Sequence, residues 1–409
     1  MLAVLALVSL AVASCADVPS ATPTPYESTP PAATPAKSAA TSAKPATAPG
    51  VPKELLKIGA VFAITGPASE FGIPARNTIR MLEQEVNVKG GINGTPIKVV
   101  IADTQSDETK TVLATKKLIE EEKVLAIIGP TQSGESLAIA DTIETARIPL
   151  VSAATSVRIV DPLKRWIFKT TQSDSLIIQV LADYLKVKGH FKIGWLSVSD
   201  AFGESGKAEF EKVAPAVVLS IVASESFGAT DTDMTAQLTR VEASNPDAIV
   251  VWAIPPAASI VSKNVAQLGV KQQVFQSYGI GNKQFIDLAG PAANGVIFPV
   301  GKLPVAEGLP NSDPQKKVLV EYTRNYTAKS GADTLSTFGG HAWDSFWIVA
   351  KALEKSGPDV AKLRDAIEGT KDFVGITGVF NFSPTDHNGL DKRAVTMVEI
   401  KDGKLIPAK

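Results

Sequence analysis

The chain has 409 residues, with 41 basic and 42 acidic side chains and a net charge of −1. Hydrophobic residues make up 44% of it and charged residues 20%, so it can bury the cores of two or more domains of ordinary size. The balanced charge gives no basic surface for nucleic acid, and we expect no such partner. With Cys15 as its single cysteine, the chain cannot form an intramolecular disulfide or a cysteine-based metal site.

An apolar run fills residues 1–14 and ends directly before Cys15. It is too short to span a bilayer, but it suits the apolar region of a signal peptide. The VASC stretch at residues 12–15 resembles the lipobox of bacterial lipoproteins, in which cleavage precedes the cysteine and the sulfur carries the lipid. The alternative is an ordinary cleavage site with an incidental cysteine. We expect lipidation because the only cysteine stands where a lipoprotein needs it, although no Lys or Arg precedes the run.

The segment that follows, residues 15–52, consists mainly of Ala, Pro, Thr and Ser. Such a composition cannot bury a core and predicts an extended, disordered tether. A lipid followed by a tether indicates an extracytoplasmic protein, in the periplasm or at the outer face of the cell membrane. No later run is apolar enough to predict a transmembrane helix, so the lipid is the only expected membrane contact.

From residue 53 onward, strand-like and helix-like runs alternate. The first series predicts helices between successive strands, the last of them over residues 135–146. Its expected strands are residues 58–62, 97–101, 124–128 and 150–151. The turns after two of these strands, GPTQSG at 129–134 and SAAT at 152–155, are rich in hydroxyls and small residues. Ligands of parallel α/β sheets bind outside the carboxyl ends of the strands, so these turns predict a small-molecule site.

A second series begins near residue 192. It predicts a helix capped by Asp231, with Met234, Leu238 and Val241 on one face. Its expected strands are residues 193–198, 217–222, 248–252 and 274–275. Helices at 335–355 and 358–369, a strand at 394–400 and a hairpin at 402–403 complete the chain. Two such series predict an α/β protein with two doubly wound lobes of mainly parallel strands.

Several ordered segments resemble the leucine/isoleucine/valine-binding protein family, the solute-binding receptors of branched-chain amino-acid type ABC importers. The resemblance covers nearly all of residues 53–409. It rests on ITGP at 64–67, KGGING at 89–94, AIIGP at 126–130, IPLVSAAT at 148–155, FKTT at 168–171 and AFGESG at 201–206.

The resemblance implies a type I periplasmic binding fold, with two lobes joined by a three-strand hinge that closes over a ligand. On that pattern the N-terminal lobe comprises residues 53–172 and 302–390, and the C-terminal lobe comprises residues 173–301 and 391–409. It also implies a monomer without cofactor or catalytic residue that docks on ABC permease subunits. A sensor feeding a separate signalling partner is the alternative function.

The resemblance also implies a set of ligand-binding residues. The serine matching Ser133 and the threonine matching Thr155 hold the ligand carboxylate in the family, and the position of Ser133 before a predicted helix is itself suited to an anion. Ala153 and Ala154 are expected to offer backbone groups. The alternatives without ligand contact are that Ser133 only caps the helix and that residues 153–155 only form a turn.

Three further residues are expected at the ligand. Phe71 and Phe202 match aromatic wall positions, although an isolated Phe is more often core. Asp174 matches a polar contact near the hinge, where it could instead cap the following helix.

Tyr278 departs from the family pattern, because binders of branched-chain amino acids carry an acidic residue there that pairs with the ligand ammonium. A phenol cannot supply that pairing near neutral pH, and charge-assisted hydrogen bonds are about twice as strong as neutral ones. Ile254 likewise replaces a tyrosine of those binders. We therefore expect a small carboxylate ligand that need not carry an α-amino group, so that aromatic and aliphatic acids are candidates as well as amino acids.

The sequence does not contain the motif of a serine hydrolase. The run nearest to a Gly-x-Ser-x-Gly elbow, at 203–206, lacks the second glycine. The three histidines are expected at the surface or at helix ends, with no metal-ligand spacing among them. We expect no enzyme activity and no bound metal.

Overall fold

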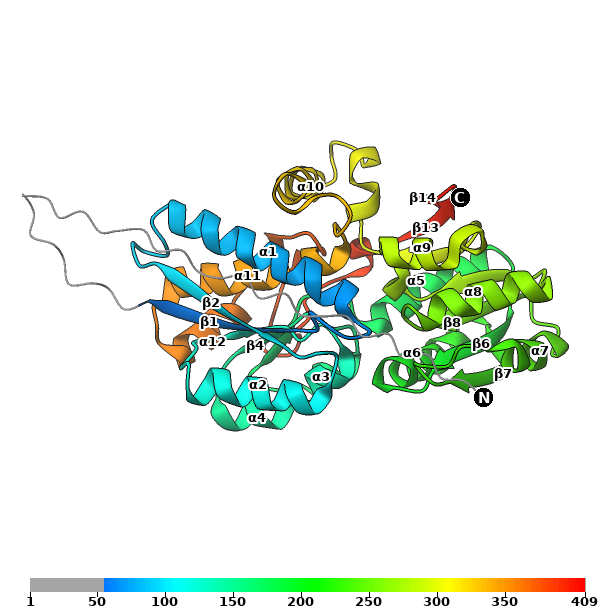
Figure 1. Cartoon of the computed structure of the whole chain (residues 1–409), viewed down its shortest axis with the longest axis horizontal. Coiled ribbons are helices and arrows are strands. Elements are labelled where there is room, and N and C mark those ends of the chain that lie inside the picture. Colours follow the sequence, from blue (N-terminus) through cyan, green and yellow to red (C-terminus); the bar gives the residue numbers. More distant parts are fainter. Residues whose placement is uncertain (1–54, 409) are drawn as a thin grey trace, which may run out of the picture. The chain divides into compact units, whose positions relative to one another are not determined.

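The computed structural model describes residues 55–408. The predicted signal peptide, the lipidated Cys15 and the tether lie outside these residues. Two sheets organise the described part of the chain (Figure 1). Because both are mainly parallel and both are flanked by helices, the predicted α/β class with two doubly wound lobes is confirmed.

The N-terminal sheet has five parallel strands in the order β2-β1-β3-β4-β5. In β1, every residue except Lys57 is buried, as expected for a parallel sheet that is covered on both faces. The strands are β1 (Leu56–Phe62), β2 (Ile97–Asp103), β3 (Ile127–Ile128), β4 (Leu150–Ser152) and β5 (Ile167–Lys169).

Helices cover both faces of this sheet. One face carries α1 packed against α11, and the other carries α2, α3 and α4 (Figure 1). The helices of this half are α1 (Ser69–Val88), α2 (Glu108–Glu120), α3 (Ser133–Ala138), α4 (Ala140–Ala146), α10 (Lys316–Ser330), α11 (Thr337–Ser356) and α12 (Val360–Glu368). A small hairpin of β11 (Phe373–Val374) and β12 (Val379–Phe380) follows them.

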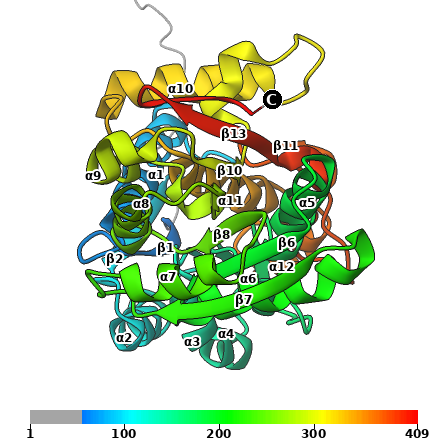
Figure 2. The same ribbon diagram turned by 90° about the vertical axis from the view of Figure 1, so that its right-hand side faces the viewer.

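The C-terminal sheet has seven strands in the order β14-β13-β10-β9-β8-β6-β7. Only β13 runs antiparallel to its neighbours (Figure 2). The strands are β6 (Lys192–Val198), β7 (Ser220–Phe227), β8 (Ala248–Trp252), β9 (Gln273–Gln276), β10 (Ile297–Val300), β13 (Thr396–Lys401) and β14 (Lys404–Pro407). The helices are α5 (Asp174–Val187), α6 (Ala201–Val213), α7 (Thr235–Ala243), α8 (Ala257–Leu268) and α9 (Lys283–Ala289).

The chain passes between the two halves three times, after β5, after β10 and after β12. Hydrogen bonds tie the first and third passages together. Gln172 Nε2 donates to the carbonyls of Thr377 at 3.0 Å and Ala394 at 2.9 Å, and Ser173 Oγ donates to Asn388 Oδ1 at 2.8 Å. The first and third connecting segments are therefore joined to each other rather than independent.

Two expected helices differ in the structure. The helix predicted at 135–146 begins at Ser133 and is divided by Ile139 into α3 and α4, because Ile139 has ψ near −4° and interrupts the helical backbone. The predicted cap at Asp231 is wrong. Its carboxylate accepts from the Gly228 N–H at 2.8 Å, and α7 begins later, after Met234.

The strand expected at 217–222 lies further along, as β7 from Ser220. Val217 instead ends a 3₁₀ turn, and Val218 has a left-handed conformation with φ 66°. The expectation for histidines is wrong for His341, which is buried within α11, and for His387, which is buried and stacked on Phe168. His190, which is half-buried, follows α5 as a helix-end residue.

No helix among residues 55–408 has the length and apolar character needed to cross a bilayer.

Candidate functional site

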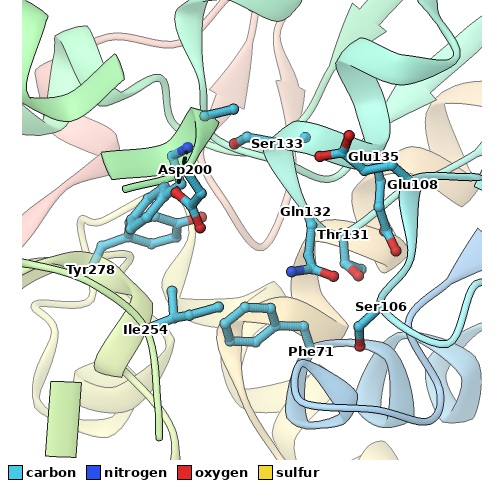
Figure 3. A pocket seen from close by; sticks show the side chains of 13 residues that line it. Phe71, Ser106, Glu108, Thr131, Gln132, Ser133, Glu135, Asp200, Ile254 and Tyr278 are labelled. Carbon is cyan, nitrogen blue, oxygen red and sulfur yellow. Dashed lines mark hydrogen bonds between the residues drawn. The ribbon is translucent and has the colours of Figure 1, made fainter. Parts of the chain in front are cut away.

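A pocket of about 90 Å³ lies where the carboxyl ends of the parallel strands of both sheets face each other. Its residues follow β1, β2 and β3 in the N-terminal half and β6, β8 and β9 in the C-terminal half. This is the location that open α/β sheets offer to ligands. The lining comprises Phe71, Ser106, Glu108, Thr131, Gln132, Ser133, Gly134 and Glu135 on one wall and Asp200, Ala201, Phe202, Ile254 and Tyr278 on the other (Figure 3).

The N-terminal wall is built around the turn between β3 and α3. Gly129 begins that turn with φ +88°, and a Cβ there would meet the Val61 carbonyl oxygen at 2.2 Å, so only glycine fits. The turn places Thr131, Gln132 and Ser133 in the pocket. Ser133 is the first residue of α3, and its Oγ accepts from the Ser156 N–H at 3.2 Å. Its own hydroxyl proton is therefore still available to a ligand.

Two glutamates complete this wall. Glu135 is buried, and its Oε1 accepts from Thr104 Oγ1 at 2.5 Å. Burial raises the pKa of Glu135 to about 7, opposed by its hydrogen bonds, and the negative charge of Glu108 raises it further. Glu108 lies against Gly134, where a Cβ would meet its Oε1 at 2.0 Å.

The C-terminal wall combines one carboxylate with aromatic and aliphatic side chains. Asp200 caps α6, with Oδ1 accepting from the N–H groups of Phe202 and Gly203 at 2.9 Å each. Burial raises the pKa of Asp200. The Phe202 ring stacks on Trp252 with centroids 5.7 Å apart and meets Tyr278 edge-on at 6.0 Å. Aromatic packing thus fixes the rings that face the pocket.

Tyr278 joins the C-terminal wall to the N-terminal half of the chain. It begins the 3₁₀ turn after β9, and its hydroxyl accepts a hydrogen bond from Thr155 Oγ1 of the other half. Its ring also lies 6.2 Å from that of Phe338, which in turn packs on Phe71 at 4.1 Å. Burial raises the pKa of Tyr278, so the phenol stays neutral at any physiological pH.

The other residues expected at the ligand lie deeper. Ala153, Ala154, Thr155 and Asp174 are buried and do not line the pocket. Thr155 contacts the pocket lining through its hydrogen bond to Tyr278. Asp174 is the first residue of α5, and its Oδ1 accepts from the N–H groups of Val157 and Ser175 at 2.9 Å each. Ser133, Phe71, Phe202 and Tyr278 therefore meet in the pocket, whereas the other four do not line it.

A buried lysine forms a hydrogen bond to the backbone of Thr155. Lys169, at the end of β5, donates to the Thr155 carbonyl and to Ser173 Oγ at 3.0 Å. Burial lowers its pKa to about 7, opposed by the charges of Asp174 and Asp386. Sequence reasoning missed Lys169, although a lysine directly after two apolar strand residues is a signal that could have identified it.

Sequence reasoning also missed the acidic residues Glu108, Glu135 and Asp200. Each comes shortly after a strand end, which is the signal that could have been used. Within residues 55–408, no group of three or more His, Cys, Asp or Glu side chains is arranged to hold a metal ion.

Comparison with known proteins gives a consistent result. Residues 56–404 match the family described as periplasmic binding protein. A leucine-, isoleucine-, valine-, threonine- and alanine-binding protein of Pseudomonas aeruginosa is 24% identical over 332 residues, which is 80% of this chain and 86% of that protein.

Solved structures have the same fold. An extracellular ligand-binding receptor from Rhodopseudomonas palustris matches with a TM-score of 0.82 and 29% identity, covering 87% of this chain and 100% of that one. A branched-chain amino acid transporter substrate-binding protein from Streptococcus pneumoniae, in complex with isoleucine, matches with a TM-score of 0.76 and 26% identity, covering 87% and 99%.

Proposed function

Because the chain belongs to the periplasmic binding protein family, we propose that it is the extracytoplasmic receptor of an ABC importer of the branched-chain amino-acid type. It captures a small carboxylate ligand between two lobes and performs no chemistry on it. The observation that carries the proposal is the pocket itself, whose walls come from the strand ends of both sheets. A site divided in this way is completed only when the two halves come together.

The lobes divide at the three passages, so that residues 53–172 with 302–390 move against residues 173–301 with 391–409. The hydrogen-bonded passages at Gln172, Ser173 and Asn388 serve as the hinge. Hinge closure is how periplasmic binding proteins enclose their ligands. A ligand that favours the closed form by a few kcal/mol is enough to make a minor population the major one.

Ser133 and Thr155 hold the ligand carboxylate from the N-terminal lobe, together with backbone groups of Ala153 and Ala154. Asp174 is a polar contact near the hinge. Phe71, Phe202 and Tyr278 cover the apolar part of the ligand. In the form described here, Tyr278 occupies the hydroxyl of Thr155, so the ligand carboxylate takes over that hydrogen bond from the phenol. This exchange couples ligand entry to the position of the C-terminal wall.

The closed receptor, a monomer, docks on the two permease subunits and delivers the ligand. A lipid on Cys15 holds it at the membrane. Replacement by Cys15→Ser is expected to move the protein from the membrane fraction to the soluble fraction, and unchanged fractionation contradicts the anchor.

A thermal-shift screen of the purified protein against amino acids and aromatic and aliphatic acids tests the proposal, because a ligand raises apparent stability by mass action. Uptake of the identified ligand should be lost in a strain that lacks the chain. A strain that retains uptake but loses a transcriptional response would favour a sensor. If none of the compounds shifts the melting temperature, the proposed receptor function is contradicted.

A further inference from the structure

A contact between α1 and α9 joins the two halves of the chain outside the pocket. Glu70 lies in the first turn of α1, in the N-terminal half, and Gln284 lies in α9, in the C-terminal half. With its nitrogen toward Glu70, the Gln284 amide donates to Oε2 at 2.9 Å and to Oε1 at 3.2 Å. Neither residue lines the pocket, so this contact is separate from the candidate ligand site.

Glu70 is partly buried where α9 and residues 333–336 approach α1. The first turn of a helix favours a carboxylate, and the backbone N–H of Glu70 donates to its own side chain. Burial outweighs both effects and raises the pKa of Glu70 to about 8. A carboxyl at this place is therefore sensitive to how much of it is covered.

No charged neighbour accounts for the raised pKa. Glu70 and Gln284 line a groove whose other charged side chains are Lys283 and Asp287 on α9 and Asp333 in the loop before α11. Lys283 is paired with Asp287, and none of the three contributes to the pKa of Glu70. Because α9 supplies part of the cover, the protonation of Glu70 depends on the position of the C-terminal half.

The Gln284 amide can bond to either form of the Glu70 carboxyl. Its nitrogen donates to the ionised carboxylate, whereas its oxygen accepts from the protonated acid when the amide is turned the other way. A hydrogen bond between the halves is therefore kept in both forms. What changes is the cost of desolvation, because α9 covers a charge in one form and a neutral group in the other.

Separation of the two halves would uncover Glu70. When α9 moves away from α1, the carboxyl regains water on that side and its pKa falls toward the ordinary value of 4.5. Between this value and about 8, the closed form binds more protons than the open form. Closure is therefore favoured as the pH falls through this window and opposed as the pH rises. The groove beside the contact gives solvent protons access to the carboxyl.

We propose that Glu70 and Gln284 form a latch between the lobes that holds the receptor closed more firmly at acidic than at alkaline pH. The proposal rests on the hinge closure of the proposed function and adds a regulation by pH to it. Glu70 acts on the position of the lobes and not on the ligand, so it is a positioning residue.

The distance between two spin labels, measured by pulsed electron paramagnetic resonance on the purified protein without ligand, tests the latch. Cys15→Ser removes the single native cysteine. Lys116→Cys on α2 and Lys263→Cys on α8 then place one label at an exposed position of each half. The ratio of closed to open molecules should rise about tenfold from pH 8.5 to pH 5.5, as a difference of one pKa unit between the two forms requires.

Three variants in the labelled protein separate the parts of the latch. Glu70→Gln keeps the size of the side chain and a polar group for Gln284 but cannot titrate, so the ratio should no longer depend on pH. Gln284→Leu removes the amide and should lower the ratio about fivefold at both pH values. Asp333→Asn, exposed in the same groove, is the control and should keep the full response to pH.

The same ratio at both pH values, or a pH response retained in Glu70→Gln, overturns the latch. So does an unchanged ratio in Gln284→Leu. If the label distance does not change with pH but changes when a compound found in the thermal-shift screen is added, the latch is wrong and the receptor function stands. If the distance changes with neither, the hinge closure of the proposed function is contradicted as well.

Discussion

The two walls of the pocket are held in place by different forces. On the N-terminal wall, hydrogen bonds fix the polar groups, as between Thr104 and Glu135 and between Ser156 and Ser133. On the C-terminal wall, ring packing fixes Phe202 and Tyr278 against Trp252 and each other. One wall therefore offers charge and hydrogen bonds, and the other mainly offers apolar cover. Substitutions should reveal this difference. The stability contributed by the polar wall should depend on pH, and that contributed by the packed wall should depend on side-chain volume.

Truncation on the packed wall should have the largest effect. Phe202→Ala removes a nearly buried ring from its stack on Trp252 and is expected to lower the free energy of unfolding by about 3 kcal/mol. Denaturant unfolding measures it. The exposed Phe191 provides the control, because Phe191→Ala should cost much less. A loss below that of Phe191→Ala would show that packing does not hold this wall.

The dependence of stability on pH should reveal the buried carboxyl of Glu135 on the polar wall. In the folded protein Glu135 keeps its proton to about pH 7, whereas in the unfolded chain it loses it near the ordinary value of 4.5. The folded state therefore binds more protons between these values, and stability falls as pH rises through this window, by up to about 3 kcal/mol from this group.

Glu135→Gln should remove this part of the dependence of unfolding free energy on pH. Glu354→Gln, at the exposed end of α11, is the control and should leave it in place. Unfolding free energies measured from pH 4 to 8 give the comparison. Parallel curves for Glu135→Gln and the unsubstituted protein would mean that Glu135 titrates in the fold as it does in solvent.

The contact between the walls should contribute less. Tyr278→Phe removes the hydroxyl bonded to Thr155, and Thr155→Val removes the partner; each is expected to cost about 1 kcal/mol. Because the two changes delete the same hydrogen bond, the double variant should cost less than the sum of the single ones. Strict additivity in denaturant unfolding would show that the two hydroxyls do not interact in solution.

The exposed ion pair at Arg158 and Glu204 should have the smallest effect. Its groups are more than half exposed, and Glu204→Gln is expected to change the free energy of unfolding by less than about 0.5 kcal/mol. Thermal unfolding at low and high salt checks this. A change comparable to that of Tyr278→Phe would place this pair among the interactions that hold the walls.

Much of the fold could be predicted from the sequence because strand and helix signals are local. The strands around Ile58, Ile193 and Ile249 are buried apolar runs, and they were found at the right places. The break at Ile139 was not, since nothing in the composition of residues 135–146 distinguishes one helix from two. The burial of His341 was missed because it depends on the packing of α11, which is a tertiary property.

For the same reason, only some of the residues that line the pocket could be predicted from the sequence. Ser133, Phe71, Phe202 and Tyr278 lie in turns or helix starts that follow strands, and they meet in the pocket. Glu135 was missed because its burial arises from contact with Thr104, 31 residues away in the sequence. Local patterns identify the end of a strand, but they do not reveal which carboxyl the neighbouring segment will cover.

The most direct test of the account is a calorimetric titration of the purified protein and its Ser133→Ala and Phe202→Ala variants with the ligand that the thermal-shift screen identifies. If the ligand binds between the two walls, both Ser133→Ala and Phe202→Ala should weaken binding by about tenfold or more, while the control Phe191→Ala binds normally. Unchanged affinity in both wall variants would contradict a ligand site at this pocket.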